Sequence, residues 1–232
     1  MKRKKFLAVT LFFVLMQSIF AQKVSNIDFT DIKSKTQDST SIYYYPFLVK
    51  RFQVNDTTLS MLDMKYIYYG NVYYASYNPY DGSENEEKFN ELYKEKKYSE
   101  AVVYGLAAFK ENPVNARLLY NMIVCYDKIE DRVTAQKYAN RYFALLDAIY
   151  ASGDGKSLKT AYVVIRVPDE YEILGDKELQ ITKQALVQDV DVLTINTKLQ
   201  KPDKGEKKVK ELYFNVRMPL LYLHEQFKKE NE

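Results

Sequence analysis

The chain has 232 residues, of which 47% are hydrophobic and 28% are charged, a composition typical of a folded globular protein. Its formal net charge is +3, but four basic residues lie within the first five positions, and removing them leaves −1. Because nucleic-acid binding requires a basic excess on one face, we expect no nucleic-acid partner. Cys125 is the single cysteine, which excludes a disulfide within the chain, and we expect it to be buried.

The first 21 residues have the pattern of a bacterial signal peptide. Basic residues 2–5 precede an apolar run over residues 6–20, and the small Ala21 follows. A helix that spans a bilayer needs about 20 apolar residues, and this run is shorter. The alternative to a cleaved signal peptide is an uncleaved membrane anchor. No cysteine follows it, so we do not expect a lipoprotein. We predict that the protein is exported and is either periplasmic or extracellular and associated with the outer membrane, with no integral membrane segment after residue 21.

The next segment is predicted to contain short helices. Apolar residues at helical spacing indicate a helix over residues 28–37. Pro46 suits the first turn of a second helix, where its missing N–H group is harmless. Ser60 followed by Asp63 resembles a capping pair that begins a third.

Residues 84–150 resemble tetratricopeptide repeats. Ala101, Ala108 and Pro113 keep the spacing of the small and breaking residues of that repeat, and Ala135 follows Ala101 at its 34-residue period. Small residues at these positions allow paired helices to approach closely. We therefore predict a helical, tetratricopeptide-like region over residues 22–150, built from antiparallel helix pairs.

The pattern changes to strands after the Gly-rich turn at residues 152–155. Runs rich in Val, Ile and alternating apolar residues predict strands over residues 161–167, 179–187, 190–197 and 209–216. A final helix is expected over residues 220–227. Short links between successive strands imply an antiparallel sheet. The fold class is therefore α+β, with a small antiparallel sheet region over residues 151–232 packed on the helices.

The chain resembles a family called domain of unknown function 4919, over nearly all residues that follow the leader. The resemblance rests on short segments that occur in this order: Tyr44-Tyr45-Pro46, Arg51-Phe52, Thr58-Leu59, Tyr68-Tyr69-Gly70, Tyr77-Asn78-Pro79-Tyr80, Asn112-Pro113, Ser152-Gly153-Asp154-Gly155, Glu170-Tyr171 with Leu174, and Tyr213-Phe214-Asn215. It implies an exported protein of Gram-negative bacteria. The family has no assigned activity, so the resemblance transfers no functional residue.

The sequence offers little catalytic chemistry. His224 is the single histidine, and Lys228 stands where a zinc metalloprotease helix needs a second one. One His and one Cys do not form a usual zinc site, so we predict neither a metal nor a cofactor. Asp154 and Glu170 are the candidate catalytic carboxylates, because a pair of carboxyl groups can cleave glycosides. The alternative is a solvated acidic turn.

Tyrosine is the unusual feature, with 22 residues. The helical spacing of Tyr66, Tyr69 and Tyr73 is typical of a core stripe. Tyr68 and Tyr74 point elsewhere on the same pattern, so they are the candidates for ligand contact, because a tyrosine offers rigid apolar area and a hydroxyl group. Tyr171 is a further candidate binding residue.

Two other short patterns, around Ser39 and Thr57, resemble the Asp-Ser/Thr motif at which some Gram-negative bacteria O-glycosylate exported proteins. The main functional hypothesis is a non-catalytic binding or assembly module for a peptide, protein or glycan. The alternatives are a carboxylate-dependent hydrolase acting on an envelope or dietary glycan, and a structural subunit of a larger envelope assembly.

Overall fold

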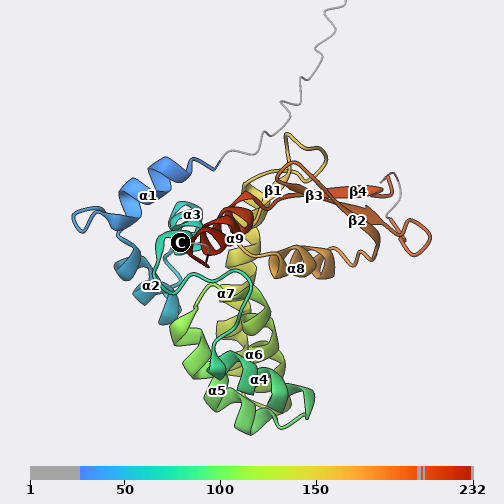
Figure 1. The fold of residues 1–232 in the computed structure, drawn as a ribbon. Coiled ribbons are helices and arrows are strands. Elements are labelled where there is room, and N and C mark those ends of the chain that lie inside the picture. The colour runs from blue at the N-terminus through green and yellow to red at the C-terminus, as the bar shows by residue number, and fades with distance from the viewer. Residues whose placement is uncertain (1–26, 203–204, 206, 231–232) are drawn as a thin grey trace, which may run out of the picture.

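The computed structural model describes residues 27–202, 205 and 207–230. The predicted signal peptide lies outside these residues. Within them the chain is α+β as predicted: helices come first, and a small sheet and a last helix follow (Figure 1). None of the described helices is both long and apolar enough to cross a membrane.

The first three helices begin where the sequence predicts them. Asp28 accepts the backbone N–H groups of Thr30 and Asp31, which caps the first helix. Ser60 and Asp63 form a complete capping box at the start of the third. The bounds of this part are α1 Phe29–Gln37, α2 Tyr45–Gln53, α3 Met61–Gly70 and the 3-10 turn η1 Asn71–Tyr73.

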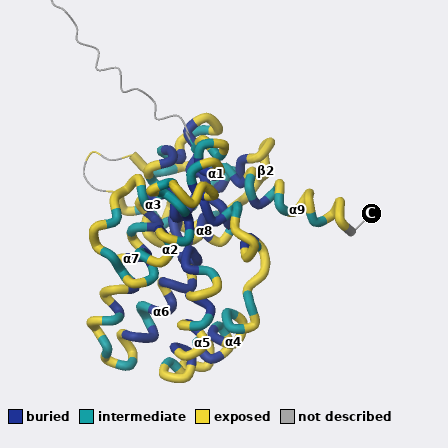
Figure 2. Tube along the Cα trace, turned by 90° about the vertical axis from the view of Figure 1, so that its left-hand side faces the viewer, coloured by how far each residue is buried: buried dark blue, intermediate teal, exposed yellow. Residues whose placement is uncertain are grey.

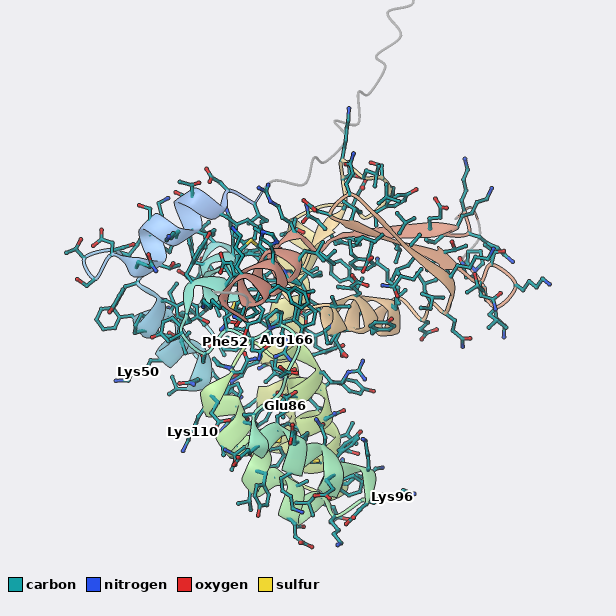
Figure 3. The ribbon with its side chains drawn as sticks, viewed as in Figure 1. Lys50, Phe52, Glu86, Lys96, Lys110 and Arg166 are labelled. Atoms are coloured by element: carbon teal, nitrogen blue, oxygen red, sulfur yellow. The ribbon has the colours of Figure 1, made fainter. Side chains whose placement is uncertain are left out.

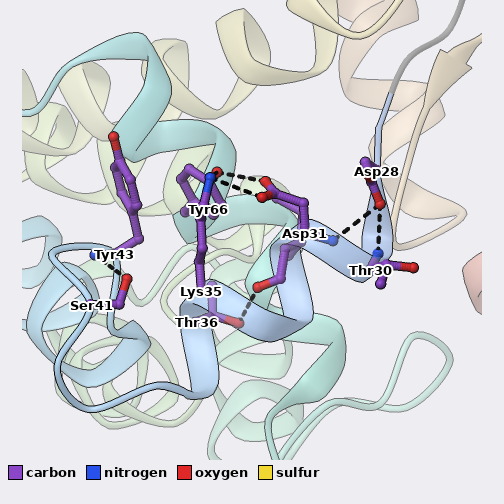
Figure 4. A network of polar contacts seen from close by, with 9 residues as sticks. Asp28, Thr30, Asp31, Lys35, Thr36, Ser41, Tyr43 and Tyr66 are labelled. Atoms are coloured by element: carbon purple, nitrogen blue, oxygen red, sulfur yellow. Dashed lines mark hydrogen bonds and ion pairs between the residues drawn. The ribbon is translucent and has the colours of Figure 1, made fainter.

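A polar cluster holds α1 on α3 (Figure 4). The hydroxyl group of Tyr66 donates to Asp31 at 2.7 Å and accepts from Lys35 at 3.0 Å. Lys35 and Asp31 also form an ion pair at 2.8 Å, and the ring of Tyr43 stacks on Tyr66 with centroids 4.1 Å apart. Because α1 is short, its own backbone hydrogen bonds would not keep it helical in isolation, and these contacts with α3 stabilise it.

Helices α4 to α7 pack in chain order, each against the next. Their bounds are α4 Glu84–Lys94, α5 Tyr98–Glu111, α6 Ala116–Lys128 and α7 Arg132–Ala151. Ala101, Ala108 and Ala135 are buried, as expected for close helix packing, and so is Cys125. The helices approach closely at Gly105, where an added Cβ atom would meet Sδ of Met122 and lie 2.9 Å from Cδ2 of Phe89.

The sheet is mixed rather than fully antiparallel as predicted. Its strand order is β1-β4-β3-β2; β2 pairs with β3 and β3 with β4 antiparallel, but β1 runs parallel to β4. The elements of this part are β1 Tyr162–Val163, α8 Pro168–Asp176, β2 Ile181–Val187, β3 Val190–Ile195, β4 Glu211–Asn215 and α9 Arg217–Glu230.

The predicted strand over residues 161–167 is shorter in the structure, where only the two residues of β1 are a strand. One further hydrogen bond joins Val164 N–H to Asn215 O at 3.1 Å, and the chain then turns and enters α8 at Pro168. Its Val- and Ile-rich composition reflects burial in the core rather than a long ladder. The sequence of such a short apolar run does not distinguish a long strand from a buried segment without a ladder.

One hydrophobic core joins the helices to the sheet. Tyrosine hydroxyl groups cross this junction: Tyr69 donates to Val163 O at 3.0 Å, and Tyr77 donates to Ile165 O at 2.7 Å. In Figure 3, Arg166 lies at this junction, whereas Lys96 lies at the distal tip of the α4–α5 pair. Figure 2 shows α9 projecting from the rest of the molecule, with the described C-terminal end at its tip.

Candidate binding groove

A groove with a volume of about 640 Å³ lies between α4, α6, α7 and α8. Aromatic rings from all four helices line it: Tyr93, Tyr120, Tyr142, Phe143 and Tyr171. Its polar lining consists of amide and charged side chains: Asn90, Lys94, Arg117, Asn121, Glu172 and Asp176. This mixture of apolar area and a few polar groups is typical of ligand sites.

Side-chain contacts fix the spacing of the groove walls. The side chain of Asn115 caps α6 by accepting the N–H group of Leu118 at 3.1 Å, and it donates to Glu86 on α4 at 2.7 Å. Arg117 of α6 also forms an ion pair with Glu172 of α8. These contacts tie α4 to α6 and α6 to α8, and so fix the positions of the helices that line the groove.

Three of the rings remain available to a ligand. Tyr120, Phe143 and Tyr171 are 47%, 52% and 39% exposed. The buried Tyr142 supports two of them, with ring centroids 5.6 Å from Tyr120 and 5.3 Å from Phe143, and its hydroxyl group donates to Glu172 at 3.2 Å. Half-exposed rings on a rigid base can bind a partner at low entropic cost.

The ion pair of Arg117 and Glu172 is one-sided in its exposure. The Glu172 side chain is 5% exposed, whereas that of Arg117 is 50% exposed. A buried carboxylate needs its partner, because removing one half of such a pair leaves an uncompensated charge. We therefore expect Glu172 to orient Arg117, which lines the groove.

The structure separates the three predicted binding tyrosines. Tyr171 lines the groove. Tyr74 is partly exposed but its ring lies against Tyr45, with centroids 4.5 Å apart, and it is not among the groove residues. Tyr68, which the sequence predicts to contact a ligand, is instead fully buried: its O–H group donates to Asp169 at 2.5 Å and accepts from Ile165 N–H at 3.2 Å, so no ligand reaches it in this conformation.

Sequence reasoning missed Tyr120 and Phe143. The signal was present, since Tyr120 falls off the stripe formed by Leu119 and Tyr126, both of which are buried. A large aromatic residue outside the apolar stripe of a helix is a candidate for contact with a partner. What the sequence does not give is that α8 closes the groove beside it.

The two candidate catalytic carboxylates do not come together as a pair. Glu170 is fully buried and lies against Asp191 of β3, and burial followed by that neighbouring charge raises its pKa to about 9. Asp154 lies in the turn after α7, where it accepts the N–H group of Lys156 at 3.0 Å. A substrate has no access to the Glu170 carboxyl group in this conformation.

Asp169 is also buried, and desolvation raises its pKa to about 7, although the positive charge of Arg166 acts in the opposite direction. Among the described residues there is no group of three or more His, Cys, Asp or Glu side chains placed to hold a metal ion. Ser39 and Thr57 both lie exposed in turns, and their O-glycosylation stays a prediction.

Comparison with known proteins gives one family and two partial relatives. The family model described as "Domain of unknown function (DUF4919)" matches residues 30–224. Over 53 residues the chain is 42% identical to Hsp70-Hsp90 organizing protein 2 from Arabidopsis thaliana and 40% identical to Hsp70-Hsp90 organizing protein from Triticum aestivum. Each match covers 23% of this chain and 9% of the relative. No solved structure gives a significant match.

Proposed function

The chain belongs to the DUF4919 family, whose description assigns no activity, and we propose that it is a non-catalytic module that binds an extended peptide segment of another protein in the aromatic groove. The observation that carries this proposal is the set of three half-exposed rings on a base of buried side chains. We also propose that it acts in the bacterial envelope after loss of residues 1–21, which rests on the sequence pattern.

The polar lining favours a peptide. A peptide backbone presents both donors and acceptors, and the amide side chains of Asn90 and Asn121 can satisfy both. The two partial relatives are named as proteins that organise Hsp70 and Hsp90, which supports a polypeptide partner. A glycan is the competing ligand, because aromatic rings also stack on sugars.

The hydrolase alternative stays a prediction that rests on Glu170. Its raised pKa is a property that catalytic acids share. Its complete burial beside Asp191 supports a structural role instead. If Glu170→Gln abolished a hydrolytic activity of the purified protein, that result would favour the enzyme.

The binding proposal can be tested by selecting peptides from a random display library, with the protein that begins at residue 22 as the immobilised target. Selected peptides are then titrated against the protein by fluorescence anisotropy. We expect Tyr120→Ala and Phe143→Ala each to weaken binding about tenfold, since each removes a ring worth about 1.4 kcal/mol of contact.

Tyr104→Ala is the matched control, because Tyr104 is a partly exposed tyrosine on α5 that does not line the groove. Peptides that bind all three variants as well as the unaltered chain would rule out the groove as the site. A glycan array probed with the same proteins forms a second arm. Glycan binding that Tyr120→Ala removes, without peptide binding, would replace the peptide by a sugar.

A further inference from the structure

Strand β2 forms an open edge of the described sheet. In the order β1-β4-β3-β2 it has a neighbour on one side, β3. Residues 182–187 are all exposed, including the apolar Leu186 and Val187. Exposed edge strands present unpaired backbone groups to other chains, and monomeric proteins usually protect them.

The register identifies the backbone groups that face outward. Odd-numbered residues of β3 bond to β4, as Ile195 N–H donating to Lys210 O at 2.8 Å illustrates, so its even-numbered residues bond to β2. The partners of those residues in β2 include Ala185, opposite Val192. The N–H and C=O groups of Gln184 and Leu186 therefore point away from the sheet.

Little protects this edge. The strand contains no proline and a single charged residue, Lys183. An irregularity in the register between Ile181 and Lys183 places Thr182 outside the regular ladder, which limits the free edge to residues 183–187. The centre of that segment is Ala185, with one outward-facing residue on each side.

We propose that β2 pairs antiparallel with β2 of a second copy of this chain, about a two-fold axis at Ala185. Gln184 of each copy then exchanges backbone hydrogen bonds with Leu186 of the other, and the two sheets become continuous. The pairing joins the same segment of both copies, so it closes as a dimer and does not propagate.

The charges and sizes of the β2 side chains are compatible with a second copy as the occupant. In this register each Lys183 lies opposite Val187 of the other copy, so like charges are not juxtaposed and an apolar residue is covered by the lysine stem. Ala185 meets its own equivalent in a non-hydrogen-bonded pair, where side chains are closest and a small residue fits. The pairing does not depend on a ligand in the groove.

Cysteine cross-linking tests the register. Opposed residues in such a pair have Cα atoms about 4.5 Å apart, within the range that a disulfide spans. Two copies of residue 183 would instead lie about 14 Å apart along the strands. We expect Ala185→Cys to form a disulfide-linked dimer under mild oxidation and Lys183→Cys not to do so.

The unaltered chain is the background control, because its Cys125 is buried, which raises the pKa of that thiol to about 11 and makes it unreactive. Equal cross-linking of the two variants would show random collision, and no cross-linking of either would show that the edge stays unpaired. Both results would overturn the proposal.

A second measurement uses sedimentation of the chain without added cysteines at increasing concentration. Leu186→Pro removes an outward N–H group and leaves the bonds to β3 intact, so we expect it to abolish the dimer. Leu186→Ala keeps that N–H group, so we expect it to weaken the dimer less. A chain that is monomeric at every concentration, or a dimer that Leu186→Pro leaves unchanged, would refute pairing through β2.

Discussion

The carboxyl group of Glu170 lies at the contact between α8 and β3. No described N–H or O–H group donates to either of its oxygen atoms. Its polar neighbour is the carboxyl group of Asp191, which accepts from Gln184 at 2.9 Å, so the two acids share a hydrogen bond only while one of them is protonated. The raised pKa of Glu170 keeps that proton in place at neutral pH.

The pKa shift makes stability depend on pH. The pKa of Glu170 is raised from 4.5 to about 9 in the folded protein, so between these values the folded chain holds a proton that the unfolded chain releases. The free energy of unfolding therefore falls as the pH rises through this window, by up to about 1.4 kcal/mol per unit. The raised pKa of Asp169, about 7, acts in the same direction.

We expect Glu170→Gln to stabilise the protein at pH 8 by a few kcal/mol and to leave it nearly unchanged at pH 4. The amide needs no proton to donate to Asp191, so the variant loses less stability as the pH rises. Urea denaturation at both pH values measures this. The exposed Glu100→Gln serves as control, and a variant that was less stable at pH 8 than the unaltered chain would contradict the shared proton.

At the residue scale, the sequence predicts helix-capping side chains but not hydrogen-bond partners that lie far apart in the chain. Ser60 and Asp63 act within one helical turn, so their capping role follows from their spacing alone. The burial of Tyr68 depends on Asp169, which lies 101 positions further along the chain. No periodicity within α3 contains that information.

Among the helices, the approach of α5 to its neighbours depends on Gly105. An added Cβ atom there would meet Phe89 at 2.9 Å as well as Met122, and the core around both residues is buried. We expect Gly105→Ala to destabilise the protein by about 1–3 kcal/mol, because overpacking exceeds the gain of about 1 kcal/mol in helix propensity.

Gly175 provides the matched control for that substitution. It lies in the last turn of α8, and nothing is within 4 Å of the position that a Cβ atom would take. We expect Gly175→Ala to be neutral or to stabilise by up to about 1 kcal/mol. Thermal unfolding of both variants compares them, and equal stability of the two would show that the tight contact at Gly105 carries no penalty.

At the scale of elements, the helices are predicted well because their apolar spacing is a local property. The strands are found, but the direction of β1 is not, since direction depends on where the chain leaves α7 and re-enters the sheet. The groove depends likewise on α8 packing against α6, which brings Tyr171 near Tyr120 across 51 positions of sequence. Such a placement follows from packing and not from any pattern.

For the molecule as a whole, the helical and sheet regions share one core. Buried residues of α3 and α7 belong to the same cluster as those of β3 and β4, and Tyr69 and Tyr77 bond across the junction to main-chain oxygen atoms. A boundary drawn near residue 150 therefore separates two sequence patterns but cuts through one shared core. We expect neither region to be stable alone.

We expect the two regions to unfold in one cooperative transition. Exposing the buried face of the sheet would also expose the faces of α3 and α7 that it covers, so neither region gains by separating first. Hydrogen exchange followed by mass spectrometry across a urea series tests this. Peptides from α6 and from β3 should lose protection at the same urea concentration, and a β3 peptide that loses protection well before α6 would show that the sheet is an independent unit.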